Sequence, residues 1–181
     1  MRLFIAINLN DEWKDWLMNA AGVLKSSAVK GRFTPRENLH LTLAFLGEID
    51  ASKLALVKHC MDQILERTFL LYLDGLGRFK GKDGDLYWAG VKKNNALLDL
   101  QNKLSDALVN AGFSLDNRKF SPHLTLGRQV RLRDESQRMD LINSLAKEGP
   151  GMKVNRISLM KSERISGRMV YTEQYGRDLA E

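Results

Sequence analysis

The feature that most constrains this chain is a tetrapeptide, His-Leu-Thr-Leu, which begins at His40 and occurs again at His123. The two copies are 83 residues apart, and the same offset separates Asp11 from Asn94, which are both suited to begin a helix. This period is longer than the roughly 20–50 residues of a solenoid repeat. The sequence therefore predicts two pseudo-equivalent lobes, each of which contributes one histidine to a shared cleft.

Each repeat unit shows the same order of predicted elements, which is strand, helix, strand with the histidine, helix, strand. The first unit spans roughly residues 2–79, the second spans 85–162, and a C-terminal strand over 169–178 follows. No linker rich in Pro, Gly or Ser separates the units, so we expect one domain over 1–181. Strands are predicted at 3–9, 39–46, 69–73, 86–91, 122–127 and 154–160, helices at 13–24, 54–65, 97–109 and 134–145, and a loop around Gly31 and Pro35.

Composition narrows the setting and the partners. The single cysteine, Cys60, cannot form an internal disulfide, which favours a reducing, cytoplasmic location. The apolar segment 3–9 is too short for a signal peptide, and no segment approaches the roughly 20 apolar residues of a membrane span. A net charge of +6 and a pI near 9.5 favour a polyanionic partner. We predict a monomer that does not enter a membrane.

The repeated tetrapeptides place polar groups on one face of each strand. Side chains alternate along a strand, so His40 and Thr42 share one face, as do His123 and Thr125, while the leucines take the other. Two imidazoles beside a phosphodiester predict in-line displacement, with one neutral ring as general base and one protonated ring as general acid. The threonine hydroxyls are candidate donors to the phosphate oxygens. From these residues alone, either histidine can be the acid.

With these motifs the chain resembles the 2H phosphoesterases, and the segments 35–47 and 122–128 are similar to the bacterial RNA 2′,3′-cyclic phosphodiesterase branch, also called 2′-5′ RNA ligases. The resemblance implies an α+β fold of two pseudosymmetric lobes, each with a mostly antiparallel sheet flanked by helices, around a central cleft. It also implies that RNA ending in a cyclic phosphate is opened to a 2′-phosphomonoester, and that tRNA halves are ligated in reverse. His40 would donate a proton to the departing 3′ oxygen and His123 would accept one from water. Arg128 is either a phosphate contact or an exposed arginine of the strand end.

The same residues also allow other interpretations. A catalytic zinc site usually has three protein ligands, and neither motif has a third ligand at suitable spacing, so we predict no metal and no cofactor. The third histidine, His59, lies in a predicted helix and is assigned a structural role. A non-catalytic basic RNA-binding module and a phosphodiesterase of small cyclic nucleotides are the alternative functions. Aromatic residues in or beside the cleft strands are candidates to stack a terminal base, and these are Phe45, Tyr87, Trp88 and Phe120.

Overall fold

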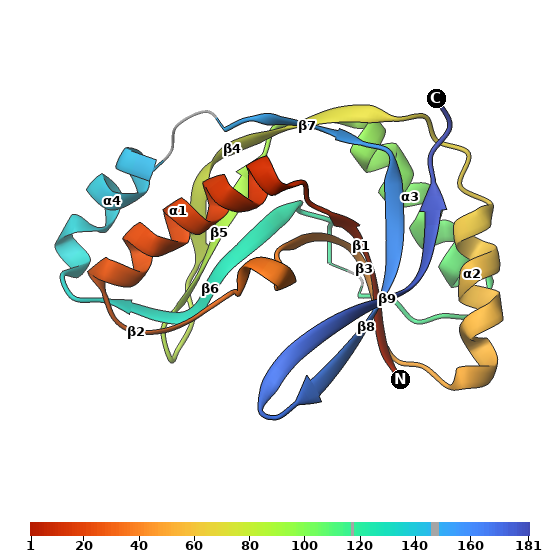
Figure 1. The fold of residues 1–181 in the computed structure, drawn as a ribbon, viewed down its shortest axis with the longest axis horizontal. Helices are drawn as coiled ribbons and strands as arrows, with labels where there is room; N and C mark the ends of the chain where they lie inside the picture. Colours follow the sequence, from red (N-terminus) through yellow and green to blue (C-terminus); the bar gives the residue numbers. More distant parts are fainter. Residues whose placement is uncertain (117, 146–148) are drawn as a thin grey trace.

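The computed structural model describes residues 1–116, 118–145 and 149–181, which form two antiparallel sheets with helices toward both ends of the molecule (Figure 1). The first sheet has the strand order β3-β1-β8-β9, and the second has the order β2-β6-β5-β4-β7. This arrangement confirms the predicted α+β fold with two antiparallel lobes. The first sheet contains β1 (Arg2–Asn8), β3 (His40–Glu48), β8 (Arg156–Ile165) and β9 (Arg168–Asp178). The second contains β2 (Ala28–Phe33), β4 (Phe69–Phe79), β5 (Asp85–Val91), β6 (His123–Leu132) and β7 (Gly151–Val154).

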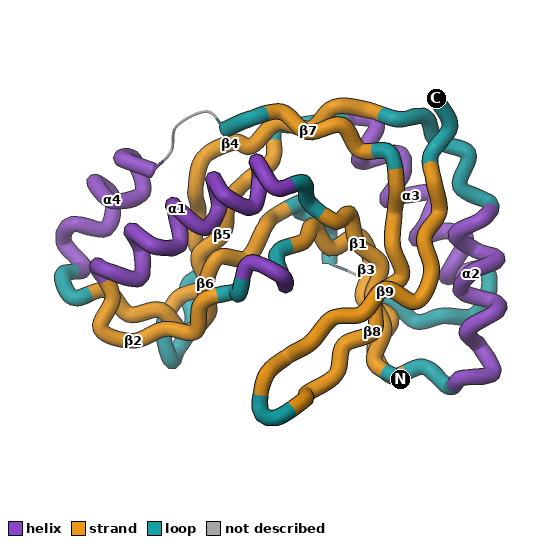
Figure 2. Tube along the Cα trace, viewed as in Figure 1, coloured by secondary structure: helices purple, strands orange, loops and turns teal. Residues whose placement is uncertain are grey.

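The helices divide between the two sheets. The α-helices are α1 (Asp11–Ser27), α2 (Leu54–Asp62), α3 (Asn95–Asn110) and α4 (Arg138–Leu145), and the short 3-10 turns are η1 (Arg36–Asn38), η2 (Ala51–Lys53) and η3 (Glu135–Gln137). Helix α3 packs on β3 and against α2, whereas α1 packs on β6 and α4 on β4. Figure 2 shows the same division, with α1 and α4 at one end and α2 and α3 at the other.

The lobes do not coincide with the two repeat units of the sequence. Strands β1 and β3 come from the first unit, but β8, which completes their sheet, comes from the second. Strand β4 of the first unit pairs in turn with β5 of the second. The first unit therefore contributes β2 and β4 to the second sheet, and the second unit contributes β8 to the first. This exchange ties the two lobes into one apolar core.

Local sequence explains where the two long helices begin. The side chain of Asn10 accepts a hydrogen bond from the backbone N–H of Trp13 at 3.0 Å, and Asn94 accepts one from Leu97 at 2.9 Å. Each bond satisfies one of the free N–H groups of the first helical turn. The cap of α1 is thus Asn10 and not Asp11, which occupies the first helical position and favours the positive end of the helix dipole.

Two segments differ from the predicted elements. The predicted loop around Gly31 is the strand β2, which lies at the edge of the second sheet and pairs with β6. Its exposed and half-exposed side chains explain why no run of apolar residues marks it in the sequence. The strand predicted at 154–160 corresponds to β8, except that its first residue, Val154, ends β7, which belongs to the other sheet.

Candidate active site

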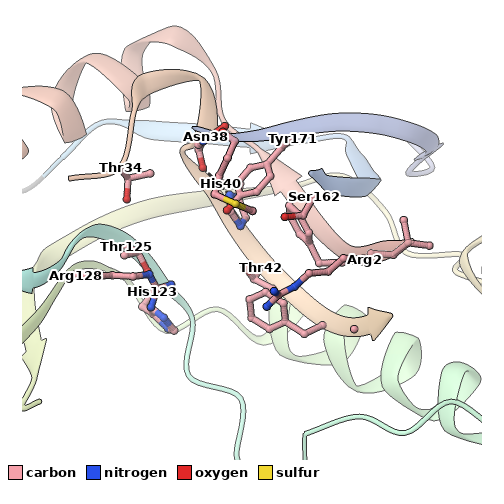
Figure 3. Close-up of a pocket in the computed structure, with 15 residues that line it drawn as sticks. Arg2, Thr34, Asn38, His40, Thr42, His123, Thr125, Arg128, Ser162 and Tyr171 are labelled. Carbon is pink, nitrogen blue, oxygen red and sulfur yellow. Dashed lines mark hydrogen bonds between the residues drawn. The ribbon is translucent and has the colours of Figure 1, made fainter. Parts of the chain in front are cut away.

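A cavity of about 450 Å³ lies where the two sheets face each other, and it contains both histidines. Residues from β3 and β6 line it together with residues from β1, β8 and β9, and Figure 3 shows His40 and His123 on opposite walls. The structure brings five predicted site residues to this cavity, namely His40, Thr42, His123, Thr125 and Arg128. The leucines of both motifs are buried on the opposite faces of their strands, as the alternation predicts.

The two imidazoles are held in the same way. Nδ1 of His40 donates to the backbone carbonyl of Asn38 at 2.7 Å, and Nδ1 of His123 donates to that of Ser121 at 2.8 Å. A carbonyl can only accept, so Nδ1 carries the hydrogen in each neutral ring and Nε2 keeps its lone pair. In both rings Nε2 is therefore the atom that can take up or release a proton in the cavity.

Aromatic residues flank each imidazole. The ring of His40 lies 4.8 Å from that of Phe4 and 5.3 Å from that of Tyr171, between ring centroids. The ring of His123 lies 5.5 Å from that of Phe79 and 6.4 Å from that of Trp88. These contacts limit how far either imidazole can rotate, so they restrict both rings to a narrow range of orientations.

The surroundings of His40 change its acidity. Burial lowers the pKa of His40, and the positive charges of Arg128 and His123 lower it further, while the hydrogen bond to Asn38 acts in the opposite direction. The neutral form of His40 is therefore favoured while the cavity holds no anion. A phosphate in the cavity would favour the protonated form, because it places negative charge beside the ring.

A β-bulge follows the threonine in each motif and redirects the strand. Thr42 pairs with Ala6 and Ala44 with Ile5, which leaves one extra residue on β3. Strand β6 has the same irregularity after Thr125, at Leu126. An extra residue reverses the alternation of faces beyond it. Positions that a regular strand would turn into the core are thereby brought to the cavity.

The residues brought to the cavity by the bulges are Phe45 on β3 and Arg128 on β6. Each lies five residues after its histidine, so the two occupy pseudo-equivalent positions. Phe45 is 59% exposed, although it is a large apolar residue. The cavity thus combines an exposed aromatic surface on one wall with a cation on the other.

The other aromatic candidates for base stacking do not line the cavity. Tyr87 is buried in the core, Phe120 packs against the core, and Trp88 contacts His123. His59 is exposed on α2, within hydrogen-bond distance of Gln63, and does not line the cavity. Cavity residues that the sequence did not reveal are Arg2, Leu3, Phe4, Thr34, Asn38, Gly47, Ser162, Met169 and Tyr171. They lie far from the motifs in sequence or carry no distinctive pattern.

Asn38 is one of these additional residues and connects two parts of the site. Its side-chain amide donates to the carbonyl of Met169 on β9 at 2.8 Å, while its own carbonyl accepts from His40. Asn38 is buried, so both bonds are shielded from water. The residue therefore fixes the position of His40 relative to the neighbouring strand.

Within residues 1–116, 118–145 and 149–181, no group of three or more His, Cys, Asp or Glu side chains is arranged to hold a metal ion. The helices of the same ranges include none that is long and apolar enough to cross a membrane.

The fold and the cavity together define a class, that of two-lobed α+β proteins with a pair of His-x-Thr motifs facing one cleft. The family model of the 2′-5′ RNA ligase superfamily matches residues 13–165. The chain belongs to this superfamily, and the resemblance to the 2H phosphoesterases is confirmed.

Individual relatives support the same placement. An RNA 2′,3′-cyclic phosphodiesterase of Methanothermobacter thermautotrophicus is 30% identical over 177 residues, covering 96% of each chain. One from Geobacillus stearothermophilus is 36% identical over 129 residues, which are 70% of this chain and 41% of that protein. The crystal structure of Escherichia coli LigT complexed with 3′-AMP superposes with a TM-score of 0.83 and 29% identity, covering 99% of this chain and 98% of that one.

Proposed function

We propose that this protein hydrolyses the 2′,3′-cyclic phosphate at the end of an RNA to a 2′-phosphomonoester. One observation carries the proposal, namely the two histidines tethered through Nδ1 to a backbone carbonyl and facing one cavity. Such an arrangement supplies a general base and a general acid on either side of a phosphorus atom. The names of the relatives support the choice of an RNA 2′,3′-cyclic phosphate as substrate.

The proposed reaction is an in-line displacement at phosphorus. Nε2 of His123 takes a proton from water, whose oxygen forms a new bond to phosphorus. The bond from phosphorus to the 3′ oxygen breaks, and Nε2 of protonated His40 gives its proton to that oxygen. The product has a 2′-phosphate and a free 3′-hydroxyl. After the reaction His123 is protonated and His40 is neutral. Return of a proton from His123 to His40 through solvent completes the cycle.

Other residues of the cavity are proposed to bind the substrate. Thr42 and Thr125 line the cavity, and their hydroxyls would donate to the non-bridging phosphate oxygens. Arg128 adds positive charge for the phosphate on the side of His123. The exposed ring of Phe45 offers a flat apolar surface on which the terminal base can stack.

Ligation of RNA ends, including tRNA halves, is proposed as the same displacement with the 5′-hydroxyl of a second RNA in place of water. His123 would take the proton of that hydroxyl as its oxygen bonds to phosphorus, and His40 would protonate the departing 3′ oxygen, which leaves a 2′-5′ phosphodiester. The two histidines would exchange their roles in the reverse reaction, the cleavage of that linkage. The superfamily name supports this activity. We further propose that the protein acts as a cytoplasmic monomer, in keeping with its one, buried, cysteine.

The test is an assay of an oligoribonucleotide with a terminal 2′,3′-cyclic phosphate in the presence of EDTA, followed by identification of the product. We expect turnover to a 2′-phosphate by the unmodified protein and by His59→Ala, a matched control whose histidine lies outside the cavity. The variants His40→Ala and His123→Ala should be at least about 100-fold slower. Full activity of both variants would refute the proposal. Binding of RNA without any conversion of the cyclic end would favour the non-catalytic RNA-binding module.

A further inference from the structure

The hairpin formed by β8 and β9 extends beyond the strand that borders it. Pairing of β1 with β8 ends where Arg2 lies opposite Ser162, whereas β8 continues to pair with β9 as far as Ile165. Figure 1 shows this hairpin projecting from the body of the molecule. Its outer part therefore has no neighbour on the β1 side, and both of its faces are open to solvent.

One face of the hairpin continues the wall of the catalytic cavity. Ser162 lies between Arg2 and Tyr171 across the sheet, and all three line the cavity. Residues directly opposite each other in a sheet share a face, and so do alternate residues along a strand. Arg164 is two residues beyond Ser162 on β8, about 7 Å farther out, so it extends the same face. Figure 3 shows Arg2 on the same side as His40 and Thr42.

The two arginines on this face have no acidic partner among the described residues. Both Arg2 and Arg164 are exposed, and neither takes part in the ion pairs found within residues 1–116, 118–145 and 149–181. In contrast, Lys161 on the other face of β8 pairs with Glu163 at 2.7 Å. Glu48, which lies opposite Arg2 in the sheet, pairs with the N-terminal amine instead, and Arg164 lies opposite Met169. Two cations that form no ion pair, in a row that leads out of the cavity, are complementary to a chain of phosphates.

We propose that Arg2 and Arg164 bind the RNA backbone on the 5′ side of the terminal nucleotide, so that the enzyme prefers RNA chains to cyclic mononucleotides. The inference rests on the proposed function. With the cyclic phosphate between the two histidines, the chain leaves the cavity past Arg2 and Ser162 and follows the hairpin to Arg164. A cyclic mononucleotide has no phosphodiester to place along this path.

The experiment compares kcat/KM for a cyclic-phosphate oligoribonucleotide with kcat/KM for a 2′,3′-cyclic mononucleotide. The test variant is Arg164→Gln, and its matched control is Arg168→Gln. Arg168 is exposed at the end of the same hairpin, but it lies opposite Ile165 and so belongs to the other face. The two variants remove the same charge, and they differ only in the face from which it is removed. Arg2→Gln is examined in the same way.

We expect Arg164→Gln and Arg2→Gln each to lower the ratio of oligonucleotide to mononucleotide kcat/KM about threefold to tenfold, which is the scale of one partly exposed charged contact. The salt dependence of kcat/KM for the oligonucleotide should also become shallower, by about 0.7 in its logarithmic slope for each lost contact. Arg168→Gln should retain the ratio of the unmodified protein. An equal effect of Arg164→Gln and Arg168→Gln, or an unchanged ratio in Arg164→Gln, would overturn the inference alone. Failure of the unmodified protein to convert either substrate would overturn the proposed function itself.

Discussion

The assignment of His40 as the general acid can be tested with a substrate whose leaving group needs no proton. In the proposed reaction His40 protonates the departing 3′ oxygen, and His123 activates water. We expect His40→Ala to slow the ordinary substrate about 10²- to 10⁴-fold, which corresponds to about 3–5 kcal/mol of lost transition-state stabilisation. With sulfur in place of the 3′ oxygen, the leaving group is a thiolate that departs without protonation. His40→Ala should then recover most of its lost rate, while His123→Ala should not.

The structure indicates that folding will not obscure this result. Alanine at position 40 loses the hydrogen bond to Asn38 and the ring contacts with Phe4 and Tyr171. Each of these contributes about 1 kcal/mol, and their sum of about 3 kcal/mol is below the 5–15 kcal/mol of a typical domain. Thermal unfolding of each variant serves as the control. The assignment is refuted if the sulfur substrate rescues His123→Ala and leaves His40→Ala slow, because the roles are then reversed.

Four further outcomes follow from the site and the core. Arg128→Gln should raise the pKa of His40, because it removes a positive charge that disfavours the protonated ring. An unchanged midpoint of the His40 titration, followed by nuclear magnetic resonance, would contradict this cause. The pKa of His40 is lower in the folded protein than in the unfolded chain, so the unfolded chain binds a proton first as the pH falls below about 6.5. The free energy of unfolding should therefore decrease in that range, and in denaturant unfolding His40→Gln should show a smaller decrease. Phe45→Ala should raise KM for a cyclic-phosphate substrate about 5- to 100-fold with a smaller effect on kcat, as expected for the loss of one stacked base. Leu41→Ala, at a position with 0% exposure, should destabilise the fold by about 2–5 kcal/mol in the same unfolding experiment.

The sequence predicted the paired histidines well because their signal is local. Each His-Leu-Thr-Leu contains the alternation that buries two leucines and leaves His and Thr on the other face, and the structure shows this for both copies. The exchange of β4 and β8 between the sheets could not be predicted in this way. Strand pairing is decided by contacts between distant segments. The 83-residue repeat fits equally well whether β4 and β8 stay in the sheet of their own repeat unit or join the other sheet, as they do.

Arg128 illustrates a different limit. In a regular strand it has the same parity as Leu124 and Leu126, so alternation alone would place it in the core. The bulge at Leu126 turns it toward the cavity instead. Gly127 directly follows the bulge, but a glycine within a strand also suits a close approach of other groups, and the position of the bulge depends on the register with β5, which the sequence of β6 alone does not contain. Tyr171 was missed for a related reason, since β9 joins the site only through its pairing with β8.

The bulges also explain how a pseudosymmetric backbone can act on a substrate without symmetry. They present equivalent positions on β3 and β6 to the cavity, and these positions hold an aromatic ring in Phe45 and a cation in Arg128. An RNA end has a base on one side of its ribose and a phosphate on the other. On the proposed function, stacking on Phe45 and attraction to Arg128 would hold the ribose in one orientation between the two imidazoles. Only one histidine would then face the 3′ oxygen, so the difference between acid and base arises from the residues beyond the motifs and not from the motifs themselves.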